Sequence, residues 1–121
     1  MNDFMSYAPV VGRLLLGGVF VFGGLEHCRN FSGVRAMMAG RGFPFPGAQL
    51  AVASALEVIA GVALQFHATR LYAALFLIAF TIAASITLLN FWTLTGEARS
   101  GVRSGFIINV AVIGGLLIAM V

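Results

Sequence analysis

Four long apolar runs dominate this 121-residue chain, and each is long enough to cross a membrane. We place them at residues 8–27, 48–66, 71–91 and 105–121. A membrane helix needs about 20 apolar residues, so four crossings with short connections use up the chain. The mean hydropathy is +1.02, and 9% of the residues are charged, against about 25% in soluble domains. The sequence therefore predicts a single all-α domain over residues 1–121, embedded in a membrane.

The connections between the spans predict how the helices are arranged. A tight polar turn at residues 67–70 makes the second and third spans antiparallel neighbours, and short connections favour a four-helix up-down transmembrane bundle. The segment 28–47 is longer, and it carries apolar residues at helical spacing: Phe31, Val34, Met37 and Met38. We expect a short interfacial helix there, between spans one and two. A run rich in Gly and Pro, residues 40–47, should end it, and we expect residues 93–104 to form a polar connection.

The basic residues, all of them Arg, indicate the orientation. Those on the side of the two long connections are Arg29, Arg35, Arg41, Arg99 and Arg103. The side with both termini has only Arg13 and Arg70, so the positive-inside rule predicts that both termini lie outside. Trp92 falls at an expected membrane interface, where aromatic residues gather. Arg residues scattered at span ends indicate contact with the lipid bilayer and not with nucleic acid.

Arg13 and Glu57 are ionisable residues inside apolar runs, where a charge is costly. Arg13 shares a helical face with Gly17 and Gly24, and Glu57 shares one with Gly61. Small residues line helix contacts in membranes, so both charged side chains should point into the bundle. The expected axial offset is less than about 10 Å, within which the two could pair directly or through water. Glu57 could alternatively relay protons or bind a ligand head group.

Other polar residues gather toward the end with the long connections. His27 ends the first span, Asn90 ends the third, and Asn109 begins the fourth. With Glu57 they could line one polar cavity, or each could hydrogen-bond across a helix interface. Two His residues on opposite sides of the membrane and a lone Cys28 do not predict a metal site, and no catalytic nucleophile–base pair stands out.

Several short stretches resemble the DoxX family of small four-span membrane proteins, and they occur in that family's order. They are residues 13–17 (RLLLG), 23–25 (GGL), 42–46 (GFPFP), 55–57 (ALE) with Gly61, 69–70 (TR), 90–92 (NFW), and Asn109 with 114–116 (GGL). The resemblance covers almost the whole chain. It implies Arg13, Glu57, Asn90 and Asn109 as a polar core. Many members carry a Lys near the end of the first span, where this chain has His27.

Two functions are consistent with these features. The first is a non-catalytic small subunit of a larger respiratory or redox complex in a bacterial cytoplasmic (inner) membrane, beside other membrane subunits or further copies of itself. The second, implied by the resemblance, is a quinone-handling protein for quinone oxidoreduction or for quinone and catechol detoxification. Its polar site would draw on Glu57, His27, Asn90, Asn109, Arg13 and Trp92. We expect no cofactor within the chain, other than quinone in the second case.

Overall fold

The computed structural model describes residues 2–121, and every regular element in that range is a helix. In chain order the elements are α1 (Asn2–Arg29), α2 (Phe31–Gly40), α3 (Pro46–Ala63), α4 (Arg70–Leu88), the 3₁₀ turn η1 (Phe91–Thr93) and α5 (Gly96–Ala119). Four of these helices, α1, α3, α4 and α5, are long and apolar enough to cross a membrane. The prediction of an all-α bundle with four spans is confirmed.

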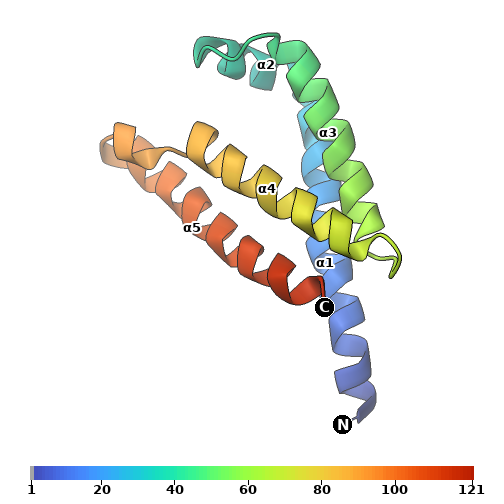
Figure 1. The fold of residues 1–121 in the computed structure, drawn as a ribbon. Coiled ribbons are helices and arrows are strands. Elements are labelled where there is room, and N and C mark those ends of the chain that lie inside the picture. Colours follow the sequence, from blue (N-terminus) through green and yellow to red (C-terminus); the bar gives the residue numbers. More distant parts are fainter. Residues whose placement is uncertain (1) are drawn as a thin grey trace.

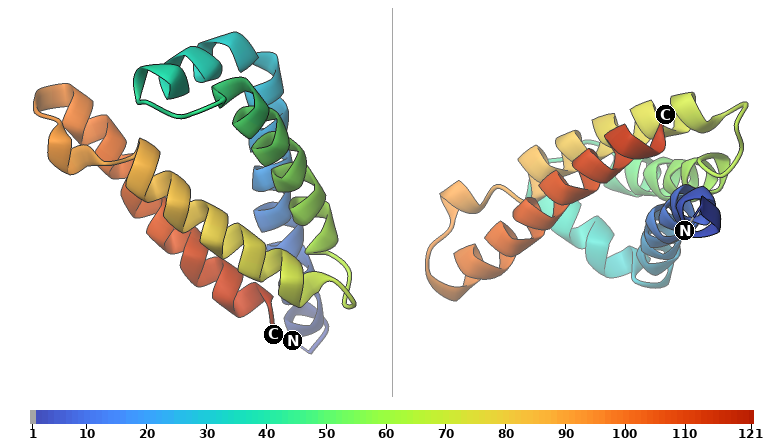
Figure 2. Two further views of the ribbon diagram at one scale, coloured as in Figure 1. Left: turned by 45° about the horizontal axis from the view of Figure 1, so that its top comes forward. Right: turned by 90° about the horizontal axis from the view of Figure 1, so that it is seen from below.

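The four long helices form two antiparallel pairs, α1 with α3 and α4 with α5 (Figure 1). The pairs approach one another at the end that carries the turn at residues 64–69 and the C-terminus. They diverge toward the end that carries α2 and η1, so the bundle has the outline of a V (Figure 2). Both termini lie at the closed end, as an up-down topology requires.

The short helix expected between the first two spans is present as α2, whose residue Met38 is buried. Gly42 follows the helix with φ of 86°, a conformation that glycine adopts without steric cost. Phe45 then turns the chain into α3 with φ of 47°, and Pro46 occupies the first turn of α3, where its missing N–H has no helical partner to lose.

The last span differs from its predicted bounds. We expected a polar connection up to residue 104, but α5 begins at Gly96. Polarity and helicity are separate properties, and the segment after Gly96 contains residues such as Glu97, Ala98 and Arg99 that form helices readily. Glu97 also lies in the first turn, where a negative charge complements the helix dipole. Most of the segment 93–104, which we expected to be a polar connection, therefore forms the first turns of α5.

The closest helix contact is between α1 and α3, and glycines make it possible. A Cβ atom at Gly61 would lie 2.6 Å from the backbone oxygen of Gly17, and a Cβ atom at Gly17 would overlap the oxygen of Gly61. One or two turns away, a Cβ atom at Gly24 would lie 2.8 Å from the Ser54 oxygen. Small residues allow such backbone approach between membrane helices, and these contacts fix the register of α1 against α3.

An apolar core lies where the two pairs converge. Phe20 of α1, Leu64 after α3, Leu77 of α4 and Leu116 of α5 belong to one buried cluster. Leu64, Leu77 and Leu116 are completely buried. The core therefore joins all four spans at the closed end and leaves the open end to polar and aromatic contacts.

Candidate functional site

Glu57 is buried at the α1–α3 contact, with 5% of its surface exposed. The missing side chain of Gly23 provides the space for its carboxylate, since a Cβ atom there would lie 2.7 Å from Oε1. The glycine on α1 therefore leaves the space that the carboxylate on α3 occupies. The prediction that Glu57 points into the bundle is confirmed.

The nearest basic group to Glu57 is the imidazole of His27, near the end of α1. Nδ1 of His27 lies 3.4 Å from Oε2 of Glu57, and 38% of the His27 side chain is exposed. This contact is longer than the 2.7–3.2 Å of most N–H···O hydrogen bonds, and Oε2 has no hydrogen-bond donor among the described residues. The pair therefore links a buried, incompletely satisfied carboxylate to a half-exposed imidazole.

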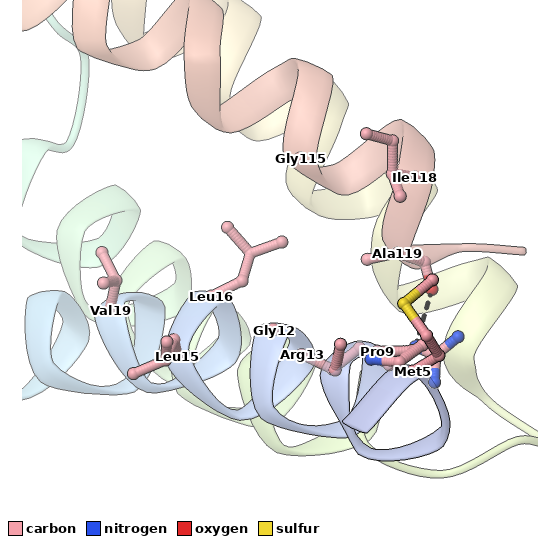
Figure 3. Close-up of a pocket in the computed structure, with 11 residues that line it drawn as sticks. Met5, Pro9, Gly12, Arg13, Leu15, Leu16, Val19, Gly115, Ile118 and Ala119 are labelled. Carbon is pink, nitrogen blue, oxygen red and sulfur yellow. Dashed lines mark hydrogen bonds between the residues drawn. The ribbon is translucent and has the colours of Figure 1, made fainter. Parts of the chain in front are cut away.

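Arg13 does not pair with Glu57, contrary to the pairing considered above. Its Nε donates to the backbone oxygen of Ala119 at 3.0 Å (Figure 3). Its Nη2 donates to the backbone oxygen of Val121 at 2.7 Å. The register explains the difference. Gln65 donates to the backbone oxygen of Arg13 and lies eight residues from Glu57 along the chain, which is about 12 Å of axial rise. Arg13 therefore ties α1 to the end of α5.

Asn109 makes its contact at the other helix pair. Its Nδ2 donates to Oγ of Ser85 at 3.0 Å, and Ser85 in turn donates to the backbone oxygen of Thr81 at 2.7 Å. This short relay crosses from α5 to α4. It is one of the interhelical polar contacts that stabilise membrane bundles.

Asn90 lies in the segment after α4, where its Oδ1 accepts from Nη1 of Arg41 at 2.9 Å. The same Nη1 donates to the backbone oxygen of Thr87 at 3.0 Å. Arg41 belongs to the segment between α2 and α3. This contact therefore joins that segment to the end of α4 at the open end of the bundle.

Trp92 packs edge-on against Phe91 and Phe106, with ring centroids 5.5 and 5.9 Å apart. The guanidinium of Arg99 lies 5.6 Å from the centre of the Phe91 ring, within the range of a cation–π contact. This aromatic cluster secures the start of α5 against η1. Trp92 therefore has a clear packing role away from Glu57.

The structure thus brings together only His27 and Glu57 of the six residues proposed from the sequence. Arg13, Asn90, Asn109 and Trp92 each contact a different part of the bundle, and Asn90 and Asn109 make the alternative kind of contact considered above, hydrogen bonds between segments. The V shape separates the α4–α5 pair from the α1–α3 pair toward the open end (Figure 2). Within residues 2–121, no three His, Cys, Asp or Glu side chains gather as a metal ion would require.

Sequence reasoning missed two groups of polar residues. Gln65 and Arg41 connect segments distant in the sequence, and Gln65 could have been noticed because it continues the face of Glu57 and Gly61. The hydroxyls of Ser54 and Thr81 are buried without a hydrogen-bond partner among the described residues. Ser and Thr residues are common at helix contacts in membranes, and their spacing does not indicate which hydroxyls lack a partner.

Four apolar spans, polar contacts at the helix interfaces and an interfacial helix define a small integral membrane protein, which resides in a lipid bilayer. The family model described as DoxX matches residues 8–90, and the chain belongs to that family. The resemblance noted from the sequence is confirmed. Comparisons with curated proteins and with solved structures found no match.

Proposed function

We propose that this protein is a non-catalytic accessory subunit of a larger membrane complex, and that its open end binds a transmembrane helix of another subunit. The observation that carries this proposal is an exposed apolar groove between α3 and α4, beside the turn that contains Phe45. We place the complex in the respiratory or redox machinery of a bacterial inner membrane. The Arg distribution supports placing both termini outside.

The groove lies where α3 and α4 begin to diverge, and its volume is about 550 Å³. Val52 and Leu56 of α3 and Phe76 and Phe80 of α4 line it. Gln49 is the polar residue in this groove, and its amide donates to the backbone oxygen of Pro44. An apolar side chain from a neighbouring helix would fit between these residues.

Phe45 supports the assignment of this surface to a partner. Its side chain is 81% exposed, and it also lines the groove. Its backbone has left-handed dihedrals, φ 47° and ψ 55°, a conformation that costs a non-glycine residue roughly 1–2 kcal/mol. Such conformations cluster at binding and active sites. We infer that the strained turn presents the Phe45 ring to the partner.

Photocrosslinking in native membranes tests this proposal. A benzoylphenylalanine residue at Val52, inside the groove, should form a discrete adduct with another membrane polypeptide, and mass spectrometry should identify that polypeptide as a subunit of a redox complex. The matched control is the same residue at Ile82, which is exposed on α4 but does not line the groove. Only lipid adducts are expected there.

Two outcomes would reject the accessory role. The first is a purified chain that stays monomeric after gentle solubilisation and forms no protein adduct at Val52. The second is an equal yield of protein adducts at Val52 and Ile82, because contact with a specific partner should distinguish the groove from the lipid-facing surface.

A second candidate function is quinone handling, and the His27–Glu57 pair supports it. Oε2 of Glu57 lacks a hydrogen-bond donor, and the half-exposed imidazole connects it to the surface. Small-molecule sites place a few polar groups in apolar surroundings, so the imidazole could hydrogen-bond a quinone carbonyl. The pair could also exchange a proton with the quinone when a partner enzyme reduces it.

Quinone binding can be measured on the purified protein with a short-chain ubiquinone analogue. Glu57→Gln and His27→Ala should each weaken binding, whereas Asn109→Ala, which disturbs the separate α4–α5 contact, should not. Unchanged binding and turnover in both site variants would leave the pair with a purely structural role.

A further inference from the structure

The geometry points to a binding site for one anionic phospholipid between α1 and α5, at the closed end of the bundle. This site is distinct from the α3–α4 groove and from the His27–Glu57 pair. It combines an apolar groove of acyl-chain character with Arg13, which lines the groove, and with Arg70, which is linked to Arg13 through Gln65.

Figure 3 shows the residues that line this groove, whose volume is about 650 Å³. Leu15, Leu16 and Val19 of α1 form one wall, and Ile118 and Ala119 of α5 form another. Along α1 it extends from Met5 to Val19, which is about 21 Å of helix and more than half of a ~30 Å hydrocarbon core. Its apolar lining suits a hydrocarbon chain, and about 9 Å of it lies between Arg13 and Val19.

Gly12 keeps the groove open. It lines the groove, and a Cβ atom built there meets nothing within 4 Å. A Cβ atom at this position therefore contacts no other part of the chain, and a longer side chain would extend into the groove. Gly18, on the same helix, also meets nothing within 4 Å, but it does not line the groove.

The charges at this end select the head group. Arg13 lines the groove, and its hydrogen bonds to Ala119 and Val121 use Nε and Nη2, which leaves the two N–H groups of Nη1 without a partner in the described part of the chain. Arg70 donates to the backbone oxygens of Leu64 and Gln65 at 3.3 Å, and Gln65 donates to that of Arg13 at 2.7 Å. The Gln65 residue thus links the two Arg residues.

Gln65 contacts both Arg13 and Arg70, and neither Arg forms an ion pair with an acidic side chain in residues 2–121. An anion bound there would add negative charge beside the two Arg side chains. Basic pockets between transmembrane helices bind anionic lipid head groups in this way. A phosphate near Arg13 and Arg70 would let one acyl chain follow Leu16 and Val19 toward the membrane centre. An apolar helix would offer Nη1 of Arg13 no acceptor, and a zwitterionic lipid would add no net negative charge beside the two Arg side chains.

Native mass spectrometry of the full chain, released from nanodiscs of equal dioleoyl phosphatidylglycerol and dioleoyl phosphatidylcholine, tests the site. The wild type should retain phosphatidylglycerol in preference to phosphatidylcholine. Gly12→Leu should lose both adducts because the side chain fills the groove, and Gly18→Leu should retain them. Circular dichroism should show the same helix content in both variants.

Charge is tested separately with Arg70→Gln, which should lower the preference for phosphatidylglycerol about fivefold, the factor that corresponds to ~1 kcal/mol per basic residue. Arg70→Lys should keep most of it. Arg103→Gln removes an exposed charge near the opposite end of the bundle and should change nothing.

Equal retention of the two lipids by the wild type would overturn the proposal. So would an equal loss of lipid in Gly12→Leu and Gly18→Leu. If Gly12→Leu converted a dimer to a monomer without losing phosphatidylglycerol, the groove would be a contact between copies of the chain instead.

Discussion

Nδ1 of His27 lies 3.4 Å from Oε2 of Glu57 and links the end of α1 to the middle of α3. Gly23 makes room for the carboxylate on the facing helix, and Gly24 brings that helix close to Ser54. The His27–Glu57 contact depends on the register of α1 against α3. Substitutions in either helix can therefore test it.

Gly17 and Gly18 are neighbours with opposite surroundings. A Cβ atom at Gly17 would overlap the Gly61 carbonyl oxygen, whereas one at Gly18 meets nothing within 4 Å. We expect Gly17→Ala to lower the free energy of unfolding by about 1–3 kcal/mol, because α1 must move away from α3. Gly18→Ala should be neutral or stabilising by up to about 1 kcal/mol. Reversible unfolding in mixed micelles measures both, and equal effects would contradict the close α1–α3 contact.

His27→Ala removes the nearest partner of the buried Glu57 carboxylate. The variant should lose about 1–3 kcal/mol of unfolding free energy, because an incompletely satisfied buried acceptor becomes less satisfied. Adding Glu57→Gln to this variant removes the charge and should restore part of the loss. A double-mutant cycle provides the measurement. Effects that add to within about 0.5 kcal/mol would show that the two side chains are independent.

Asn109 and Ser85 offer a test of the α4–α5 contact, since their side chains are 3.0 Å apart. Ala substitutions at both positions should give a coupling energy of about 0.6 kcal/mol, and at most about 1.7 kcal/mol, as for other hydrogen bonds between membrane helices. Thr87 provides the control, because its hydroxyl bonds within its own helix to Ala83. Asn109→Ala combined with Thr87→Ala should show no coupling. A coupling energy as large as that measured between Asn109 and Ser85 would argue against the assigned contact.

Phe45→Gly should stabilise the isolated protein while weakening partner binding. Glycine removes the left-handed strain of roughly 1–2 kcal/mol, but its unfolded-state entropy offsets part of that gain. A net gain of about 0.5–1 kcal/mol is therefore expected from thermal unfolding in detergent, together with a lower adduct yield at Val52. Phe43→Gly is the control, because Phe43 lacks positive φ and is half-buried, so it should destabilise the protein.

The apolar pattern was sufficient to predict α2, the four spans and the up-down topology, because membrane crossing requires long apolar helices whatever their neighbours. The inward direction of Glu57 also followed from local spacing, since small residues mark the contact face. The helix that contains the last predicted span begins earlier than that span, because hydropathy marks the apolar part of a helix, whereas α5 extends into polar residues from Gly96.

The sequence did not predict which polar residues contact one another. The spacing placed Arg13 and Glu57 on inward faces but could not fix the axial register of α1 against α3, which depends on backbone contacts such as that of Gly17 with Gly61. That register pairs Glu57 with His27 and leaves Arg13 to α5. The divergence of the two helix pairs likewise separates Asn90 and Asn109 from Glu57. The sequence by itself determined where the four apolar helices and α2 lie and that Glu57 faces inward, because these features depend on local periodicity. Only the tertiary structure decided which polar groups meet, because that depends on helix register and on the angle between the pairs.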